Sequence, residues 1–138
     1  KKDAEHFKKI QENVIEQYEK FASYDNFKFD ASLSIGENMA DISAVAICIE
    51  YLRDFQLLNK YILPIQSISF KTFFIYYAYH QRQIVNNKAI HAQMLTNPHP
   101  LEKYRTNVPL SRIEIFRKLY RISKKDKMWW KTSDKIWS

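Results

Sequence analysis

The sequence predicts an all-α domain, and three observations support this prediction. Apolar residues recur at spacings of three and four along much of the chain, a pattern typical of amphipathic helices. No stretch shows the strict apolar–polar alternation that is typical of a strand. Only one glycine, Gly36, occurs in 138 residues, so Asn, Asp, Ser and Pro must form the turns. We therefore expect helices joined by short polar connections.

The first half of the chain predicts two long helices. One extends from Asp3 to about Ala22, and its apolar face contains Phe7, Ile10, Val14, Tyr18 and Phe21. Residues 23–34 have no helical period and are interpreted as a loop. A second helix is predicted from about Gly36 to Leu58, and its inner face would consist of Ile42, Val45, Ala46, Ile49, Leu52 and Phe55. Cys48 lies on this apolar helix and is interpreted as a small core residue.

The second half predicts a third helix, a short helix, a loop and a final helix. Pro64 marks a break before a helix over about residues 67–86, which is dense in Phe70, Phe73, Phe74, Tyr77 and Ile84, and the aromatic residues there would lie mostly in the core. A short helix is expected at about 88–95, and three prolines then indicate an ordered loop over 96–109. The residues from Ser111 to Glu114 have the pattern of a capping box that starts a final helix with Ile115, Phe116, Leu119 and Tyr120.

Composition restricts the partners and the compartment. The length allows one domain at most, and no run approaches the roughly 20 apolar residues that span a bilayer. The net charge of +7 is concentrated near the C-terminal end, which also contains three Trp residues. This would suit nucleic acid, but no known nucleic-acid-binding motif accompanies it, so we expect no nucleic-acid partner. A single cysteine excludes internal disulfides and favours a reducing, cytoplasmic compartment.

The residues with the clearest chemical meaning lie at the start of the second predicted helix, in Gly36-Glu37-Asn38-Met39-Ala40-Asp41. Glu37 and Asp41 are four residues apart, about one helical turn, so both carboxylates project from one face. By spacing alone, they could simply be solvated acids that complement the helix dipole. The string as a whole, however, resembles the G-E-N-x-A-D motif of the neprilysin and endothelin-converting-enzyme family of zinc metallopeptidases.

That resemblance implies a fold and a set of roles. The family's catalytic domain is thermolysin-related and of the gluzincin type, and this chain would be its all-α C-terminal part. Glu37 would be the third protein ligand of zinc, and Asp41 would hydrogen-bond one of the two zinc-binding histidines. Such roles suit the residue types, because a catalytic zinc takes two His and one carboxylate, and a neighbouring acid orients a ligating His.

A second segment, from Asn97 to Leu110, resembles the family's H-x-P-x-x-x-R-x-N-x-P-L pattern, with the first proline in a shifted register. His99 and Arg105 keep the six-residue separation. The resemblance implies that His99 donates to the oxyanion of the tetrahedral intermediate and that Arg105 binds a backbone carbonyl of the peptide substrate. Without the resemblance, His99 would be interpreted as a turn residue and Arg105 as a surface cation.

The chain also departs from the family. Residues 73–78, Phe-Phe-Ile-Tyr-Tyr-Ala, are similar to its F-F-x-x-F-A helix, but Ser43 and Ala44 replace two glycines and Arg82 replaces a disulfide cysteine. No H-E-x-x-H occurs, because no two of the four histidines are four residues apart. We therefore expect residues 1–138 to be one fragment of a peptidase catalytic domain, with the zinc-binding helix and the general base upstream. On its own, this chain would be inactive.

The expected function is accordingly that of a C-terminal segment of a zinc metalloendopeptidase, which hydrolyses peptides in the complete protein. An alternative is a degenerate structural or interaction protein that keeps the peptidase fold within a larger assembly and is held through its basic C-terminal surface. An intact H-E-x-x-H upstream would favour the enzyme. Loss of that motif would favour the structural protein.

Overall fold

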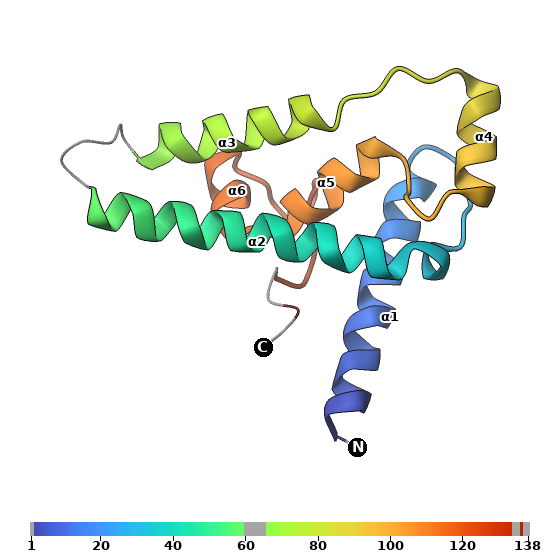
Figure 1. Ribbon diagram of the computed structural model, residues 1–138, viewed down its shortest axis with the longest axis horizontal. Helices are drawn as coiled ribbons and strands as arrows, with labels where there is room; N and C mark the ends of the chain where they lie inside the picture. Colours follow the sequence, from blue (N-terminus) through green and yellow to red (C-terminus); the bar gives the residue numbers. More distant parts are fainter. Residues whose placement is uncertain (1, 60–65, 134–135, 137–138) are drawn as a thin grey trace.

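All regular elements among the described residues are helices, so the all-α prediction is confirmed (Figure 1). The computed structural model describes residues 2–59, 66–133 and 136. The elements in chain order are α1 (Lys2–Ser23), the 3₁₀ helix η1 (Ala31–Ser34), α2 (Ile35–Leu58), α3 (Gln66–His80), α4 (Asn87–Thr96), α5 (Glu102–Arg112) and α6 (Glu114–Leu119).

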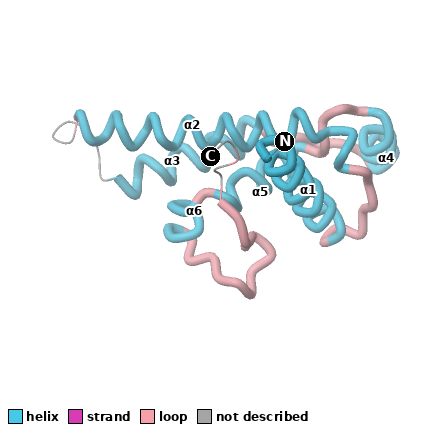
Figure 2. Tube along the Cα trace, turned by 90° about the horizontal axis from the view of Figure 1, so that it is seen from below, coloured by secondary structure: helices cyan, strands magenta, loops and turns pink. Residues whose placement is uncertain are grey.

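The longest helix, α2, organises the others. It packs against α1, α3 and α5, while α6 packs against α3 and α5. In Figure 1, α3 runs alongside α2 and α1 crosses α2 steeply near its N-terminal end. Figure 2 shows α1, α5 and α6 on one side of α2. One long side of α2 is therefore covered by other helices, as its buried residues require.

Two hydrophobic clusters form the core, and both α2 and α5 contribute to each. The first cluster joins α1 to the start of α2 and to α5 through residues that include Val14, Tyr18, Met39, Ile42, Tyr104 and Val108. The second joins the later part of α2 to α3 and α6 and consists of Val45, Ile49, Phe70, Phe74, Leu110, Ile113 and Phe116. Met128 packs against both clusters. The α2–α5 contact therefore links the two halves of the core.

A buried polar network attaches the end of α5 to α1. Arg112 is 1% exposed, and it donates from Nε to Gln17 Oε1 at 2.6 Å and from Nη2 to Asn13 Oδ1 at 2.8 Å. Gln17 in turn donates to Ser111 Oγ at 2.6 Å. Because buried polar groups are costly when they lack partners, this network selects one arrangement of α1 on α5.

The third helix is shorter than predicted. It ends at His80 and not near residue 86, and residues 82–86 form no regular element. The Asn86 side chain accepts from the Ala89 N–H at 2.8 Å and so caps α4, which requires Asn86 to be extended. Ile84, predicted to lie in the third helix, is instead in the connection between α3 and α4 and is fully exposed.

The predicted loop over 96–109 is confirmed only for residues 97–101, and the predicted capping box is wrong. Residues 102–112 form α5, with Pro109 in the helix interior. Ser111 does not cap a new helix, because its hydroxyl donates to the Val108 carbonyl at 2.7 Å and accepts from Gln17. The residue at the start of α6 is Ile113, which has no side-chain cap. Proline content alone indicated a loop, but packing of α5 against α1 and α2 stabilises the helix.

Several predicted positions of side chains also change. Phe55 is 40% exposed and Cys48 is exposed, so neither belongs to the core of α2. The predicted basic surface loses two of its charges, because Arg112 is buried and Arg117 donates to the carbonyls of Ser111, Trp130 and Thr132. Trp130 is buried in the first cluster. The predicted break at Pro64 lies outside the described residues.

One stretch of the described residues, Ala31–Leu58, is long and apolar enough to cross a membrane by length and composition alone. This is weak evidence, because core helices of soluble proteins pass the same test. A third of its most apolar window is buried inside the structure. Packing of α2 against three other helices therefore accounts for only part of its apolar character.

We predict that Gln17→Leu lowers the free energy of unfolding by about 2–3 kcal/mol, because a buried guanidinium loses a charge-assisted hydrogen bond and Ser111 loses its donor. Urea unfolding of the chain measures the change. Lys118→Ala is the control: it removes an exposed ion pair with Glu114 at 2.7 Å and should change the free energy by less than about 1 kcal/mol. Equal effects of the two substitutions would contradict the role assigned to the network.

Candidate functional site

The structure brings the four candidate residues together in two pairs. Glu37 and Asp41 lie in the first two turns of α2, which follows directly from η1. His99 lies in the loop between α4 and α5, and Arg105 lies near the start of α5. Glu37 contacts His99, and Asp41 contacts Arg105. The partners are 62 and 64 residues apart in the sequence.

Glu37 and His99 form the outer pair. Glu37 Oε2 lies 3.1 Å from His99 Nε2, and the side chains of His99 and Glu37 are 37% and 48% exposed. The loop position of His99 is defined by an Asx turn, since its backbone N–H donates to Asn97 Oδ1 at 2.9 Å. Asn97 itself ends α4, where its N–H donates to the Gln93 carbonyl. His99 is therefore presented at the surface next to the carboxylate of Glu37.

Asp41 and Arg105 form the inner pair. Arg105 donates from Nε to Asp41 Oδ2 at 2.7 Å and from Nη2 to Asp41 Oδ1 at 2.9 Å. Both side chains are mostly buried, at 15% exposure for Asp41 and 21% for Arg105, and the hydrogen bonds with Asp41 raise the pKa of Arg105 above its usual value. This bidentate geometry leaves Arg105 Nη1 without a hydrogen-bond partner among the described residues. Arg105 thus keeps a donor for another group.

Two tyrosines, Tyr18 and Tyr77, lie near the inner pair, although their apolar helix faces predicted only core positions for them. Tyr18 is fully buried and its hydroxyl has no hydrogen-bond partner in the described part of the chain. Burial, and next the Asp41 carboxylate, raises the pKa of Tyr18. Tyr77 of α3 donates from its hydroxyl to the Arg105 carbonyl oxygen at 2.9 Å. The sequence feature that could have indicated a role for Tyr77 is its hydroxyl, because the F-F-x-x-F-A pattern has Phe at this position.

Among the candidate residues, Glu37 is suited to be one ligand of a zinc site. Glu37 offers an accessible carboxylate oxygen, and carboxylates bind zinc in catalytic sites with two histidines. His99 is the imidazole next to it, and no group of three or more His, Cys, Asp and Glu side chains suitable for a metal occurs among the residues that the structure describes. Further ligands would therefore have to come from outside the residues that the structure describes.

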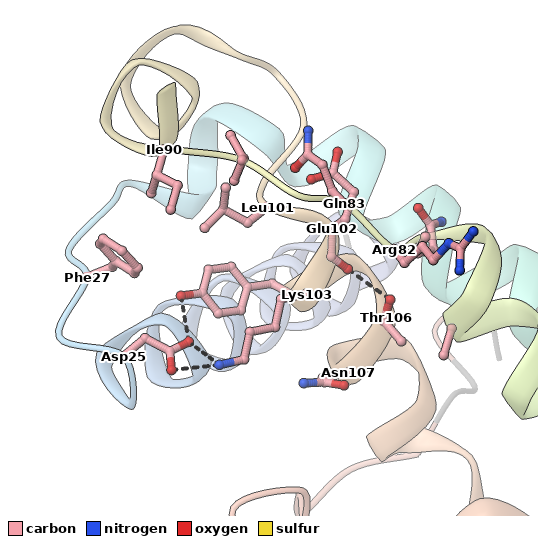
Figure 3. Close-up of a pocket in the computed structure, with 14 residues that line it drawn as sticks. Asp25, Phe27, Arg82, Gln83, Ile90, Leu101, Glu102, Lys103, Thr106 and Asn107 are labelled. Atoms are coloured by element: carbon pink, nitrogen blue, oxygen red, sulfur yellow. Dashed lines mark hydrogen bonds and ion pairs between the residues drawn. The ribbon is translucent and has the colours of Figure 1, made fainter. Parts of the chain in front are cut away.

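A pocket of about 520 Å³ lies away from these two pairs (Figure 3). Its walls come from four parts of the chain: the loop after α1, the end of α3 together with residues 81–85, α4, and α5 with the residue before it. On one side, Lys103 pairs with Asp25 at 2.7 and 2.8 Å, and the Tyr104 hydroxyl donates to Asp25 at 3.0 Å. Neither Glu37 nor Asp41 lines this pocket.

Comparison with known proteins supports the family that the two segments resemble. The sequence matches peptidase family M13 over residues 1–136. It is also 28% identical over 127 residues to the endothelin-converting enzyme homolog of Locusta migratoria. That alignment covers 90% of this chain but 17% of the relative, so the chain spans about one sixth of that protein. No solved structure matches the chain.

The family match extends over every described residue, including both segments that hold the candidate pairs. The chain therefore belongs to peptidase family M13, the family of neprilysin-like metallopeptidases.

Proposed function

We propose that this chain is the C-terminal part of the catalytic domain of a zinc metalloendopeptidase. The observation that carries the proposal is the pairing of the two segments: Glu37 meets His99 and Asp41 meets Arg105 across 62 and 64 residues of sequence. Isolated surface acids and cations would have no reason to converge in this way. The pairing supports a single site to which α2 and the 97–112 segment both contribute.

In this proposal His99 and Arg105 act on the peptide substrate. A half-exposed imidazole in a defined loop suits a donor to the oxyanion of the tetrahedral intermediate. Arg105 is immobilised by Asp41 but retains Nη1, which suits a hydrogen bond to a backbone carbonyl of the substrate. Both groups are therefore pre-oriented, which lowers the entropic cost of binding and of reaction.

Glu37 would hold zinc together with two histidines from outside this chain, and Asp41 would orient one of those histidines. When bound, zinc would supply an activated water and polarise the scissile carbonyl. Since Glu37 contacts His99 at 3.1 Å, a metal ligand and an oxyanion donor would lie side by side.

An exposed apolar stripe on α2 supports a partner from the remainder of the peptidase. The stripe shares the helix face of Glu37 and consists of Ala40, Ala44, Ile47, Tyr51, Phe55 and Leu58. Ile47, Tyr51 and Leu58 are 68%, 67% and 83% exposed. Exposed apolar surface of this kind is typical of an interface, and the small residues nearest Glu37 would allow close approach of another helix. We propose that upstream sequence covers this stripe.

The alternative is a degenerate structural protein of an assembly, which would be held through its basic C-terminal surface and would not need catalysis. We favour the enzyme because Glu37, His99 and the free donor of Arg105 remain accessible. We also propose a reducing compartment, because the chain has one cysteine and cannot form an internal disulfide. Activity and metal content of the complete protein separate the enzyme from the structural protein.

We predict that the 138-residue chain alone binds zinc weakly and hydrolyses no peptide, because a single carboxylate is a poor zinc site. Zinc titration and a peptidase assay with and without chelator test this. Chelator-sensitive hydrolysis by the purified chain would contradict it.

In the complete protein, His99→Ala should lower kcat by roughly 10²–10³-fold with little change in KM, because one transition-state donor is lost. His80→Ala is the matched control, since His80 is an exposed histidine at the end of α3. Wild-type kinetics for His99→Ala would show that this loop is only a connector.

Arg105→Ala should raise KM roughly tenfold or more, because a charged hydrogen bond to the bound substrate is lost in the ground state as well as in the transition state. Steady-state kinetics measure this, with thermal unfolding to verify that the fold is intact. Arg53→Ala is the control, because Arg53 forms an ion pair with the neighbouring exposed Glu50 on the same helix. An unchanged KM for Arg105→Ala would exclude the proposed carbonyl contact.

A further inference from the structure

The backbone of Arg105 lacks one of its normal partners because of a proline. In an α-helix, the carbonyl of each residue accepts from the N–H four residues later. The residue four after Arg105 is Pro109, which lies in the interior of α5 and has no N–H. The Arg105 carbonyl oxygen therefore cannot accept its usual intrahelical hydrogen bond.

A side chain from another helix supplies a donor in its place. The Tyr77 hydroxyl of α3 donates to the Arg105 carbonyl oxygen at 2.9 Å. The Tyr77 ring is half-buried and stacks on Phe73 with centroids 6.2 Å apart and an interplanar angle of 16°. Burial, followed by the nearby Asp41 carboxylate, raises the pKa of Tyr77 to about 12, so the phenol remains protonated at neutral pH. It is thus a permanent donor.

Arg105 is therefore attached to two other helices at once. Its guanidinium is bound to Asp41 of α2, and its carbonyl is bound to Tyr77 of α3. A proline in a helix interior weakens the backbone ladder and permits bending. Without the Tyr77 hydroxyl, the first turn of α5 would be held by its side chains alone, and its backbone could shift against the rest of the helix. Such a shift would move the guanidinium relative to a bound peptide.

We propose that Tyr77 is a positioning residue that replaces the donor missing at Pro109 and thereby sets the position of Arg105 for binding of a peptide substrate. This rests on the proposed function of Arg105. It adds a residue that neither of the two site segments contains, and the hydroxyl is an addition of this chain to the F-F-x-x-F-A pattern.

The test uses Tyr77→Phe, Pro109→Ala and the double variant in the complete protein. Tyr77→Phe keeps the ring and removes only the donor. We expect it to raise KM, and the Kd of a peptide for the metal-free protein, by roughly fivefold with kcat within about twofold, as for loss of one neutral hydrogen bond. In the Pro109→Ala background, a backbone N–H is restored at this position and donates to the Arg105 carbonyl. Adding Tyr77→Phe there should change either constant by less than about twofold.

The control is Tyr76→Phe, since Tyr76 is 69% exposed on α3 and should leave both constants unchanged. If Tyr77→Phe lowers the melting temperature but leaves KM and Kd at wild-type values, the contact is structural only and the proposal is wrong. If its effect is equally large with and without Pro109, the hydroxyl does not replace the missing N–H. A wild-type protein that neither binds nor cleaves peptide would instead overturn the proposed function itself.

Discussion

The bidentate ion pair between Asp41 and Arg105 is the interaction on which the rest of the arrangement depends. It lies at the contact between α2 and α5, the two helices that contribute to both hydrophobic clusters. A mostly buried ion pair is favourable only when its geometry satisfies both partners, and two parallel hydrogen bonds meet that condition. The pair therefore specifies how α5 sits on α2 more than it adds to stability.

The position of the outer pair follows from that arrangement. With α5 fixed on α2, the short loop between α4 and α5 has little freedom, and the Asx turn at Asn97 directs His99 toward Glu37. The start of α2 is defined in turn by η1, where the Asp30 side chain accepts from the Ser32 N–H at 2.9 Å. Local hydrogen bonds at the start of α2 and in the loop before α5 thus place the exposed side chains of Glu37 and His99.

One side of α2 is covered by other helices and another side is exposed, and this division suits the proposed function. One side carries the core residues and Asp41, and the stripe that begins at Glu37 remains uncovered by the described residues. The chain covers 17% of its relative, so most of that relative lies outside the aligned part. Under the proposed function, further sequence that packs on α2 would account both for the open stripe and for the missing metal ligands.

The sequence by itself determined the helical class, the approximate extents of α1, α2 and α4, the acids of α2 and the two segments typical of the family. Those features depend on local periodicity and on short motifs, which the order of residues contains directly. Only the tertiary structure decided that residues 102–112 are helical despite Pro109, that Ile84 and Cys48 are exposed, and that Arg112 is buried. It also decided that Asp41 binds Arg105 and that Tyr77 contacts the Arg105 backbone. These outcomes depend on hydrogen bonds and packing between residues far apart in sequence, whose energies outweigh local propensity and cannot be read from spacing.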